Sequence, residues 1–243
     1  MGAVRKIIFI IALLVFLGSG GYIGYHYYEA YKEDSAFDEL KTRKGHDLAA
    51  LHKKNNDLVG WIKVPDTEID YPVVQTPDDP EFYLRKNFEG EYSVAGTPFM
   101  DANSKRGESK NYLIYGHNIK AGTMFHDLLE YEDEDFWLKH QYFRYDELRK
   151  GKQVNGRYKV VAFFRSEIKD KDSAQFQYYT YPYINDRKTY EEYIRGVKSI
   201  AAFKTGVKAK WPAQLVTLST CAYHTDEGRF AVVGVKVREK EVE

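Results

Sequence analysis

The chain of 243 residues contains a single cysteine, Cys221, so a disulfide bond within the chain is excluded. What remains is one free thiol. Most free cysteines are small buried hydrophobic residues, and that is one interpretation of Cys221. The other is a reactive thiol, which requires access to solvent and a nearby base or cation.

An excess of either charge is also missing, since 36 lysines and arginines balance 36 aspartates and glutamates. Such a chain lacks the basic surface expected of a protein that binds nucleic acid. The sequence has no H-E-x-x-H, Walker A, dinucleotide-binding or zinc-ligand spacing, so we expect no metal and no cofactor. The acidic run at residues 130–135 is interpreted as a solvated helix face rather than a calcium site, because the ligand spacing of a calcium loop is absent.

A long apolar run occurs once, near the N-terminus. It is strongest from Ile7 to Leu17 and continues more weakly to Tyr25, which is about the length that a spanning helix needs. A cleavable signal peptide is the alternative, but no A-x-A-like site follows the run. Basic residues before the run predict a cytoplasmic N-terminus. We expect residues 1–28 to form a cytoplasmic tip and a transmembrane signal anchor, and residues 29–243 to form an extracellular domain.

The extracellular part reads as a single α+β domain, mainly β. Residues 29–57 have the pattern of a helical brace, and residues 76–107 are rich in loop-forming residues. Helices are predicted at residues 123–140 and 186–203, and strands at residues 58–64, 69–75, 111–118, 142–145, 156–166, 213–220 and 229–237. Strands outnumber helices and do not alternate strictly with them, which favours an α+β domain or a barrel over a doubly wound sheet.

The position of Cys221 within its predicted strand favours a reactive thiol. In AQLVTLSTC, alternation places Cys221 on the same face as Thr217 and Ser219, which is the more polar face. Cys221 also ends the strand, just before the polar loop AYHTDEG. Both facts argue against a simple buried hydrophobic residue.

A base for this thiol has to come from seven histidines. Three of them lie in the anchor or the brace, and His126 and His140 are interpreted as surface or cap residues of the predicted helix. His224 is close in sequence but lies in a loop that would hold it poorly. His117 lies at the C-terminal end of NYLIYG, where Gly116 permits a tight turn. The residues favour His117 and leave His224 as the alternative.

Arg229 begins the last predicted strand, at the end of an otherwise apolar stripe. An arginine there commonly snorkels into solvent. It could instead act as a fixed cation for a peptide carbonyl or for the oxyanion that forms when a thiolate attacks.

Together, TLSTC at residues 217–221, Arg229 in the next strand, and NYLIYGHN with His117 resemble the sortases, the membrane-anchored cysteine transpeptidases of Gram-positive surfaces. The stretches GWIKVPDTEIDYPVVQ, GTPFMD and YGHNIKAGTMFHDL are similar to those of class B sortases. The resemblance implies a closed, eight-stranded β-barrel with N-terminal helices and a long helix inserted before the penultimate strand.

The resemblance also implies roles for individual residues. Cys221 is expected to be the nucleophile, His117 the general acid and base, and Arg229 the group that positions substrate and stabilises the oxyanion. The residues expected to line the groove for the sorting signal are Tyr115, Ser219, Tyr179 and Thr180. His224 becomes at most a groove residue.

The implied reaction is cleavage of a C-terminal sorting signal of secreted proteins at a threonine carbonyl. The resulting thioester is then resolved by an amine of a peptidoglycan precursor or a pilin. Two other functions fit the residues without the resemblance. One is a membrane-anchored cysteine endopeptidase that only hydrolyses, and the other is a surface binding module with an inert thiol.

Overall fold

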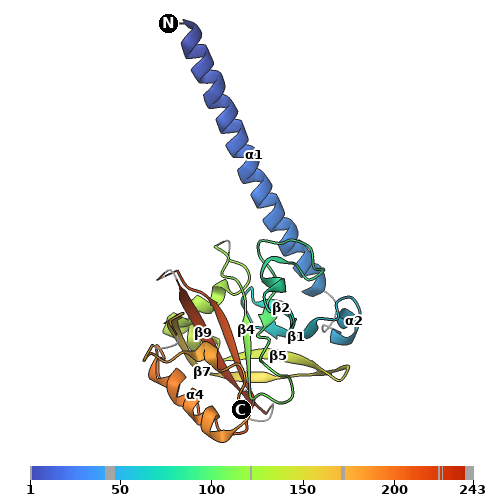
Figure 1. The fold of residues 1–243 in the computed structure, drawn as a ribbon, viewed down its shortest axis with the longest axis vertical. Coiled ribbons are helices and arrows are strands. Elements are labelled where there is room, and N and C mark those ends of the chain that lie inside the picture. Colours follow the sequence, from blue (N-terminus) through green and yellow to red (C-terminus); the bar gives the residue numbers. More distant parts are fainter. Residues whose placement is uncertain are drawn as a thin grey trace. The chain divides into compact units, whose positions relative to one another are not determined.

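The computed structural model describes residues 2–41, 47–120, 122–170, 173–223, 225 and 227–238. These residues fall into two units, divided between residues 42 and 43. The helices and strands, shown in Figure 1, are α1 (Gly2–Lys41), α2 (Leu48–His52), β1 (Leu58–Lys63), β2 (Asp70–Val74), η1 (Phe82–Arg85), β3 (Phe99–Met100), β4 (Asn111–Tyr115), η2 (His126–Glu132), α3 (Glu134–Lys139), β5 (Tyr142–Arg149), β6 (Lys152–Val154), β7 (Arg157–Glu167), η3 (Tyr178–Thr180), α4 (Arg187–Ser199), β8 (Leu215–Cys221) and β9 (Gly228–Val237).

The first unit consists of α1, a single continuous helix. Its stretch Arg5–Tyr25 has a mean hydropathy of 2.3 and is long and apolar enough to cross a membrane. The large apolar side chains of this stretch are exposed to the surroundings, as a lipid-facing helix requires. The predicted boundary between residues 28 and 29 falls inside α1, and the assignment of residues 1–28 as the anchor stays a prediction.

The nine described strands form one sheet in the order β1-β2-β3-β4-β8-β9-β7-β5-β6. Because β1 also pairs with β5, eight of these strands close into a ring, and β6 extends from β5 outside it. The pairs β2–β3 and β4–β8 are parallel, and the others are antiparallel. The predicted closed, eight-stranded barrel is confirmed.

The long helix α4 lies between β7 and β8 in the sequence, as predicted, although it is shorter than residues 186–203. Its N-cap is Asp186, whose side chain accepts a hydrogen bond from the amide of Thr189 at 2.9 Å. Four side chains at helical spacing are buried: Tyr190, Tyr193, Ile194 and Val197. They pack with one face of β8 and β9, and Figure 1 shows α4 beside the β7 and β9 strands.

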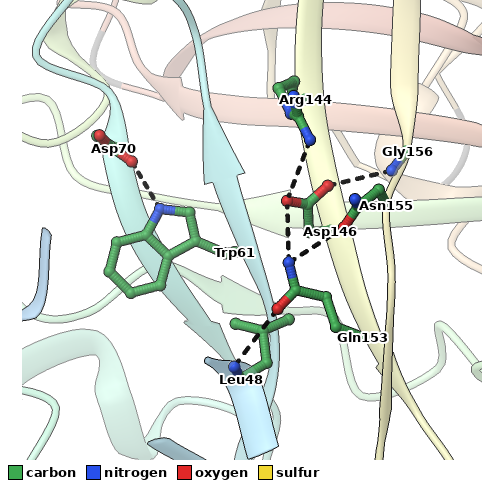
Figure 2. Close-up of polar contacts among 8 residues, drawn as sticks. All are labelled: Leu48, Trp61, Asp70, Arg144, Asp146, Gln153, Asn155 and Gly156. Carbon is green, nitrogen blue, oxygen red and sulfur yellow. Dashed lines mark hydrogen bonds and ion pairs between the residues drawn. The ribbon is translucent and has the colours of Figure 1, made fainter. Parts of the chain in front are cut away.

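Within the predicted brace, the short helix α2 is held to the barrel by a polar network (Figure 2). The backbone amide of Leu48 donates to Oε1 of Gln153 in β6, at 3.5 Å. The Gln153 amide group faces the carboxylate of Asp146, which also accepts from the backbone amide of Gly156 at 3.1 Å and pairs with Arg144. Leu48 itself is fully buried, so α2 combines apolar packing with these polar contacts.

The helix predicted at residues 123–140 is divided into η2 and α3. Asp133 separates them, because its side chain accepts from the amide of Phe136 at 3.0 Å and so caps a new helix. In the acidic run, Glu132 forms a two-pronged pair with Arg165 of β7 at 2.5 Å. These contacts give the two acidic residues structural roles on the surface of the barrel.

Candidate active site

The ends of three neighbouring strands bring the predicted catalytic residues together. In the parallel β4–β8 pair, Tyr115 lies opposite Ser219, and the amide of Gly116 donates to the Ser219 carbonyl at 3.0 Å. Continuing that register by two residues brings His117 to the level of Cys221. In the antiparallel β8–β9 pair, Cys221 lies directly opposite Arg229.

All three residues line one pocket of about 490 Å³. The lining residues are Pro80, Glu81, Leu84, Phe99, Asp101, Ala102, Asn103, Tyr115, Gly116, His117, Ile168, Tyr179, Ser219, Thr220, Cys221, Glu227 and Arg229. The lining includes apolar and acidic side chains, and among the described residues that form it Arg229 is the one lysine or arginine. Such a pocket suits an extended peptide whose reacting carbonyl is placed beside the sulfur.

Cys221 is the last residue of β8 and is partly exposed, whereas the other six residues of the strand are buried. Thr217 and Ser219, on the same face, are covered by tyrosines: Tyr193 bonds Thr217 at 2.6 Å, and Tyr178 bonds Ser219 at 2.7 Å. The polar face predicted for this strand is therefore an internal hydrogen-bonded layer that opens to solvent only at the thiol.

His117 is held by a backbone carbonyl. Its Nε2 lies 2.8 Å from the carbonyl oxygen of Leu84 in η1. A carbonyl can only accept, so Nε2 carries the proton and Nδ1 is left as the basic nitrogen of the neutral ring. Burial lowers the pKa of His117 below its usual 6.5; the Leu84 carbonyl opposes this shift, and the nearby Arg85 cation adds to it.

The backbone around Leu84 leaves no room for a side chain at Gly96. Gly96 has φ +64°, and a Cβ there would lie 2.7 Å from the Leu84 oxygen and 2.8 Å from the Tyr83 oxygen. The amide of Thr97 also donates to the Tyr83 carbonyl at 3.1 Å. Because it has no side chain, Gly96 lets the loop backbone pack closely against the Leu84 carbonyl, which orients His117.

Gly116 has a different role from the tight turn that was predicted. Its φ is not positive, but a Cβ there would lie 2.6 Å from the ring of Phe125. Glycine is required because the ring of Phe125 approaches the backbone closely, just before His117.

The guanidinium of Arg229 remains partly accessible, with 25% of the side chain exposed. It donates to the carbonyl of Gly228 at 3.0 Å and lies 3.6 Å from the carboxylate of Glu227. Glu227 is 61% exposed, so this ion pair is screened by water and contributes little to stability. The guanidinium of Arg229 is therefore held only weakly, and it has N–H groups available to bind a ligand.

Three of the four predicted groove residues line the pocket, and Thr180 does not. Tyr115 donates to the carboxylate of Asp101 at 3.1 Å, and burial raises its pKa well above the usual value. Tyr179 donates to the Lys169 carbonyl at 3.2 Å. Ser219 lines the pocket, but its hydroxyl is already hydrogen-bonded to the hydroxyl of Tyr178. The exposed Thr180 instead caps its own turn by donating to Gln177.

Among the other histidines, His140 is the C-cap of α3, as predicted, and its Nδ1 lies 2.8 Å from the Phe136 carbonyl. His126 begins η2 and is partly exposed, and its Nδ1 lies 2.8 Å from Oδ1 of Asn118. His224 lies outside the described residues. Within the described ranges, no group of three or more histidine, cysteine or acidic residues is arranged to hold a metal ion.

Residue patterns missed the contribution of η1 and its flanking loop. Leu84, Glu81 and Asp101 come from the stretch that was predicted to be mostly loop, yet they line the pocket. The most important atom there is the Leu84 carbonyl oxygen, which contacts His117. Every residue has a backbone carbonyl, so the residue type at position 84 could not have predicted this contact.

A model of the sortase domain matches residues 62–237 of the chain. Sortase B of Listeria monocytogenes is 33% identical to it, over 94% of this chain and 95% of the relative. Sortase B of Staphylococcus aureus is 31% identical, over 76% of this chain and 72% of the relative. A solved complex of Staphylococcus aureus sortase B with a substrate superposes with a TM-score of 0.73 at 26% identity, over 87% and 99% of the two chains.

The matched region contains the barrel from the last two residues of β1 to the end of β9, and with it the pocket around the single cysteine. The Listeria relative extends the similarity over nearly the full length of the chain. The chain therefore belongs to the sortase family of cysteine transpeptidases, as a class B sortase.

Proposed function

We propose that this sortase cleaves a C-terminal sorting signal of secreted proteins at a threonine carbonyl and transfers the protein to an amine. The observation that carries the proposal is the meeting of Cys221, His117 and Arg229 at adjacent strand ends over one pocket. The complex of the Staphylococcus aureus relative with a substrate supports a substrate-binding role for this pocket.

In the first half-reaction, the thiol proton of Cys221 passes to Nδ1 of His117 and the sulfur attacks the threonine carbonyl. The negative charge on the carbonyl oxygen is stabilised by the guanidinium of Arg229. Collapse of this intermediate breaks the carbon–nitrogen bond, and His117 delivers the proton to the departing amine. The product is a thioester on Cys221.

In the second half-reaction, an amine attacks the thioester, its nitrogen bonds to the carbonyl carbon, and the carbon–sulfur bond breaks. His117 takes the amine proton and returns it to the sulfur, which restores the resting thiol. The acceptor amine is that of a peptidoglycan precursor or a pilin. Water in its place gives slow hydrolysis.

The location proposed for this reaction is the outer face of the cell membrane. The apolar stretch Arg5–Tyr25 serves as a single anchor with its N-terminus in the cytoplasm. The anchor keeps the enzyme at the surface where exported substrates and lipid-linked acceptors arrive. Its partners are secreted proteins with a sorting motif and the molecule that supplies the amine.

The experiment is intact-mass analysis of the full chain in detergent after incubation with a panel of candidate sorting peptides, with Cys221→Ala in parallel. An acyl adduct on the wild type alone, discharged faster when an amine is added, is the expected result. An adduct that water discharges equally well with or without amine would indicate an endopeptidase. Wild-type turnover by Cys221→Ala would overturn the proposal.

A further inference from the structure

The segment that follows β4 folds back on itself and carries a buried amide next to His117. The His117 carbonyl accepts from the amide of Phe125 at 2.8 Å, and Asn118 forms an isolated antiparallel bridge with Met124. Asn118 is only 6% exposed. It does not line the pocket around the thiol, so the role of its side chain has to be sought in its own contacts.

Both ends of the Asn118 amide are engaged. Nδ2 donates to the backbone carbonyl of Cys221 at 2.9 Å, and Oδ1 lies 2.8 Å from Nδ1 of His126. The Cys221 carbonyl can only accept, which fixes the amide nitrogen on that side and the amide oxygen on the other. His126 must therefore carry a proton on Nδ1 and donate it to Asn118.

This arrangement links two segments that are 103 residues apart in the sequence. The peptide plane after the thiol is bonded to the residue that follows the proposed base. Cys221 is the last residue of β8, so its carbonyl lies where the strand gives way to a polar loop. The loop adds a weaker contact of its own, from the hydroxyl of Tyr223 to the Asn118 carbonyl at 3.3 Å.

We propose that Asn118 is a positioning residue, oriented by His126, that fixes the backbone of Cys221 relative to the backbone of His117. The inference rests on the proposed catalytic roles of Cys221 and His117. It adds that the hydrogen bond from Asn118 to the Cys221 carbonyl sets the distance between their backbones. Reacting groups must be held closely, because a misplacement of about 1 Å can lower a rate by roughly 100-fold.

The test compares Asn118→Asp with Asn185→Asp in the full chain. The first places a carboxylate oxygen against the Cys221 carbonyl, where two acceptors repel each other. The second makes the same change of charge in an exposed loop, where the amide only donates to a tyrosine hydroxyl. We expect Asn118→Asp to lower kcat by about 10- to 100-fold with KM nearly unchanged, whereas Asn185→Asp should match the wild type.

His126 provides a second variant that is useful if Asn118→Asp folds poorly. His126→Ala removes the donor to Asn118 and should lower kcat, and His126→Gln, which keeps a side-chain N–H group, should restore part of it. A merely structural role would instead lower the melting temperature of both variants equally, without this recovery.

Alkylation of Cys221 by iodoacetamide across pH separates this inference from the proposed function, because it needs no sorting peptide. Wild type and Asn118→Asp should differ in the pH dependence of the alkylation rate. Identical profiles, or a raised KM with normal kcat, would overturn the positioning role. Failure of the wild type to form any acyl adduct would count against the proposed function alone.

Discussion

Cys221 and Arg229 are directly opposite each other in the β8–β9 ladder, so their side chains project from the same face of the sheet. The two backbone positions that carry the thiol and the guanidinium are thereby set by a β-sheet pair rather than by a loop. Rigid elements hold functional residues more accurately than loops do, and the backbone of the proposed oxyanion partner is placed in the same way as that of the nucleophile.

Replacing the guanidinium of Arg229 with an ammonium should impair the enzyme strongly. Arg229→Lys retains the charge but loses the planar fork of donors, so we expect kcat/KM to fall by about 100- to 1,000-fold. The matched control is Arg165→Lys in the neighbouring β7 strand, which is paired with Glu132 on the exposed surface. Steady-state kinetics in which the two variants behave alike would reduce Arg229 to a packing role.

The lowered pKa of His117 predicts the acid limb of the pH–rate profile. Protonation of His117 while Cys221 is still a thiol removes the acceptor for the thiol proton, so activity is lost at low pH. Because burial lowers this pKa below 6.5, kcat/KM should stay high down to pH 6.5 and fall only at more acidic values. An acid limb centred above 6.5 would contradict the assignment of His117 as the base.

The same shift should appear in the stability of the protein. The unfolded chain binds a proton at His117 more readily than the folded chain does, so the free energy of unfolding decreases as the pH falls from 6.5 through the folded pKa. Urea unfolding of wild type and His117→Gln at pH 7.5 and at pH 5 measures this contribution. The variant should lose less stability than the wild type between the two values.

Gly96→Ala should affect catalysis through the backbone alone. The added Cβ would press on the Leu84 oxygen, which orients His117, and we expect kcat/KM to fall by about tenfold or more. Gly90→Ala is the control, since Gly90 also has a positive φ but its Cβ would meet nothing within 4 Å. Both variants should lose about 1–2 kcal/mol from left-handed strain, while only Gly96→Ala should lose activity.

Tyr178 should stabilise the layer beneath the active site. Tyr178→Phe leaves the buried Ser219 hydroxyl without its partner, which costs about 1–3 kcal/mol of unfolding free energy. Tyr190→Phe removes a buried hydroxyl that has no hydrogen-bond partner within the described part of the chain, so it should be neutral or slightly stabilising. Equal losses in chemical denaturation would show that the bond to Ser219 contributes nothing.

The sequence predicted most strands because their apolar runs are long and bounded by turn residues, as in β7 and β9. It missed β6, a strand of three largely exposed residues. The turn before β6 uses Lys150 and Gly151, both at positive φ, as a two-residue hairpin requires. A lysine at the first of these positions is not a recognisable turn signal.

The candidate site was predictable where residue type carries the chemistry, as for Cys221, His117 and Arg229. What could not be predicted depends on backbone atoms and on distant pairing. The Leu84 carbonyl and the Gly96 contact are invisible in the residue pattern, and Asn118 acquires its partner only when β4 and β8 become neighbours.

The place of β8 in the sheet has a consequence for how the enzyme matures. One edge of β8 pairs with β4, formed more than one hundred residues earlier, and the other pairs with β9, the last strand of the sheet. Contacts of such long range form late in folding. In a polypeptide synthesised from the N-terminus, His117 is therefore made long before Cys221, and Arg229 follows last. The surroundings of Cys221 are therefore complete only when β9 has paired with β8.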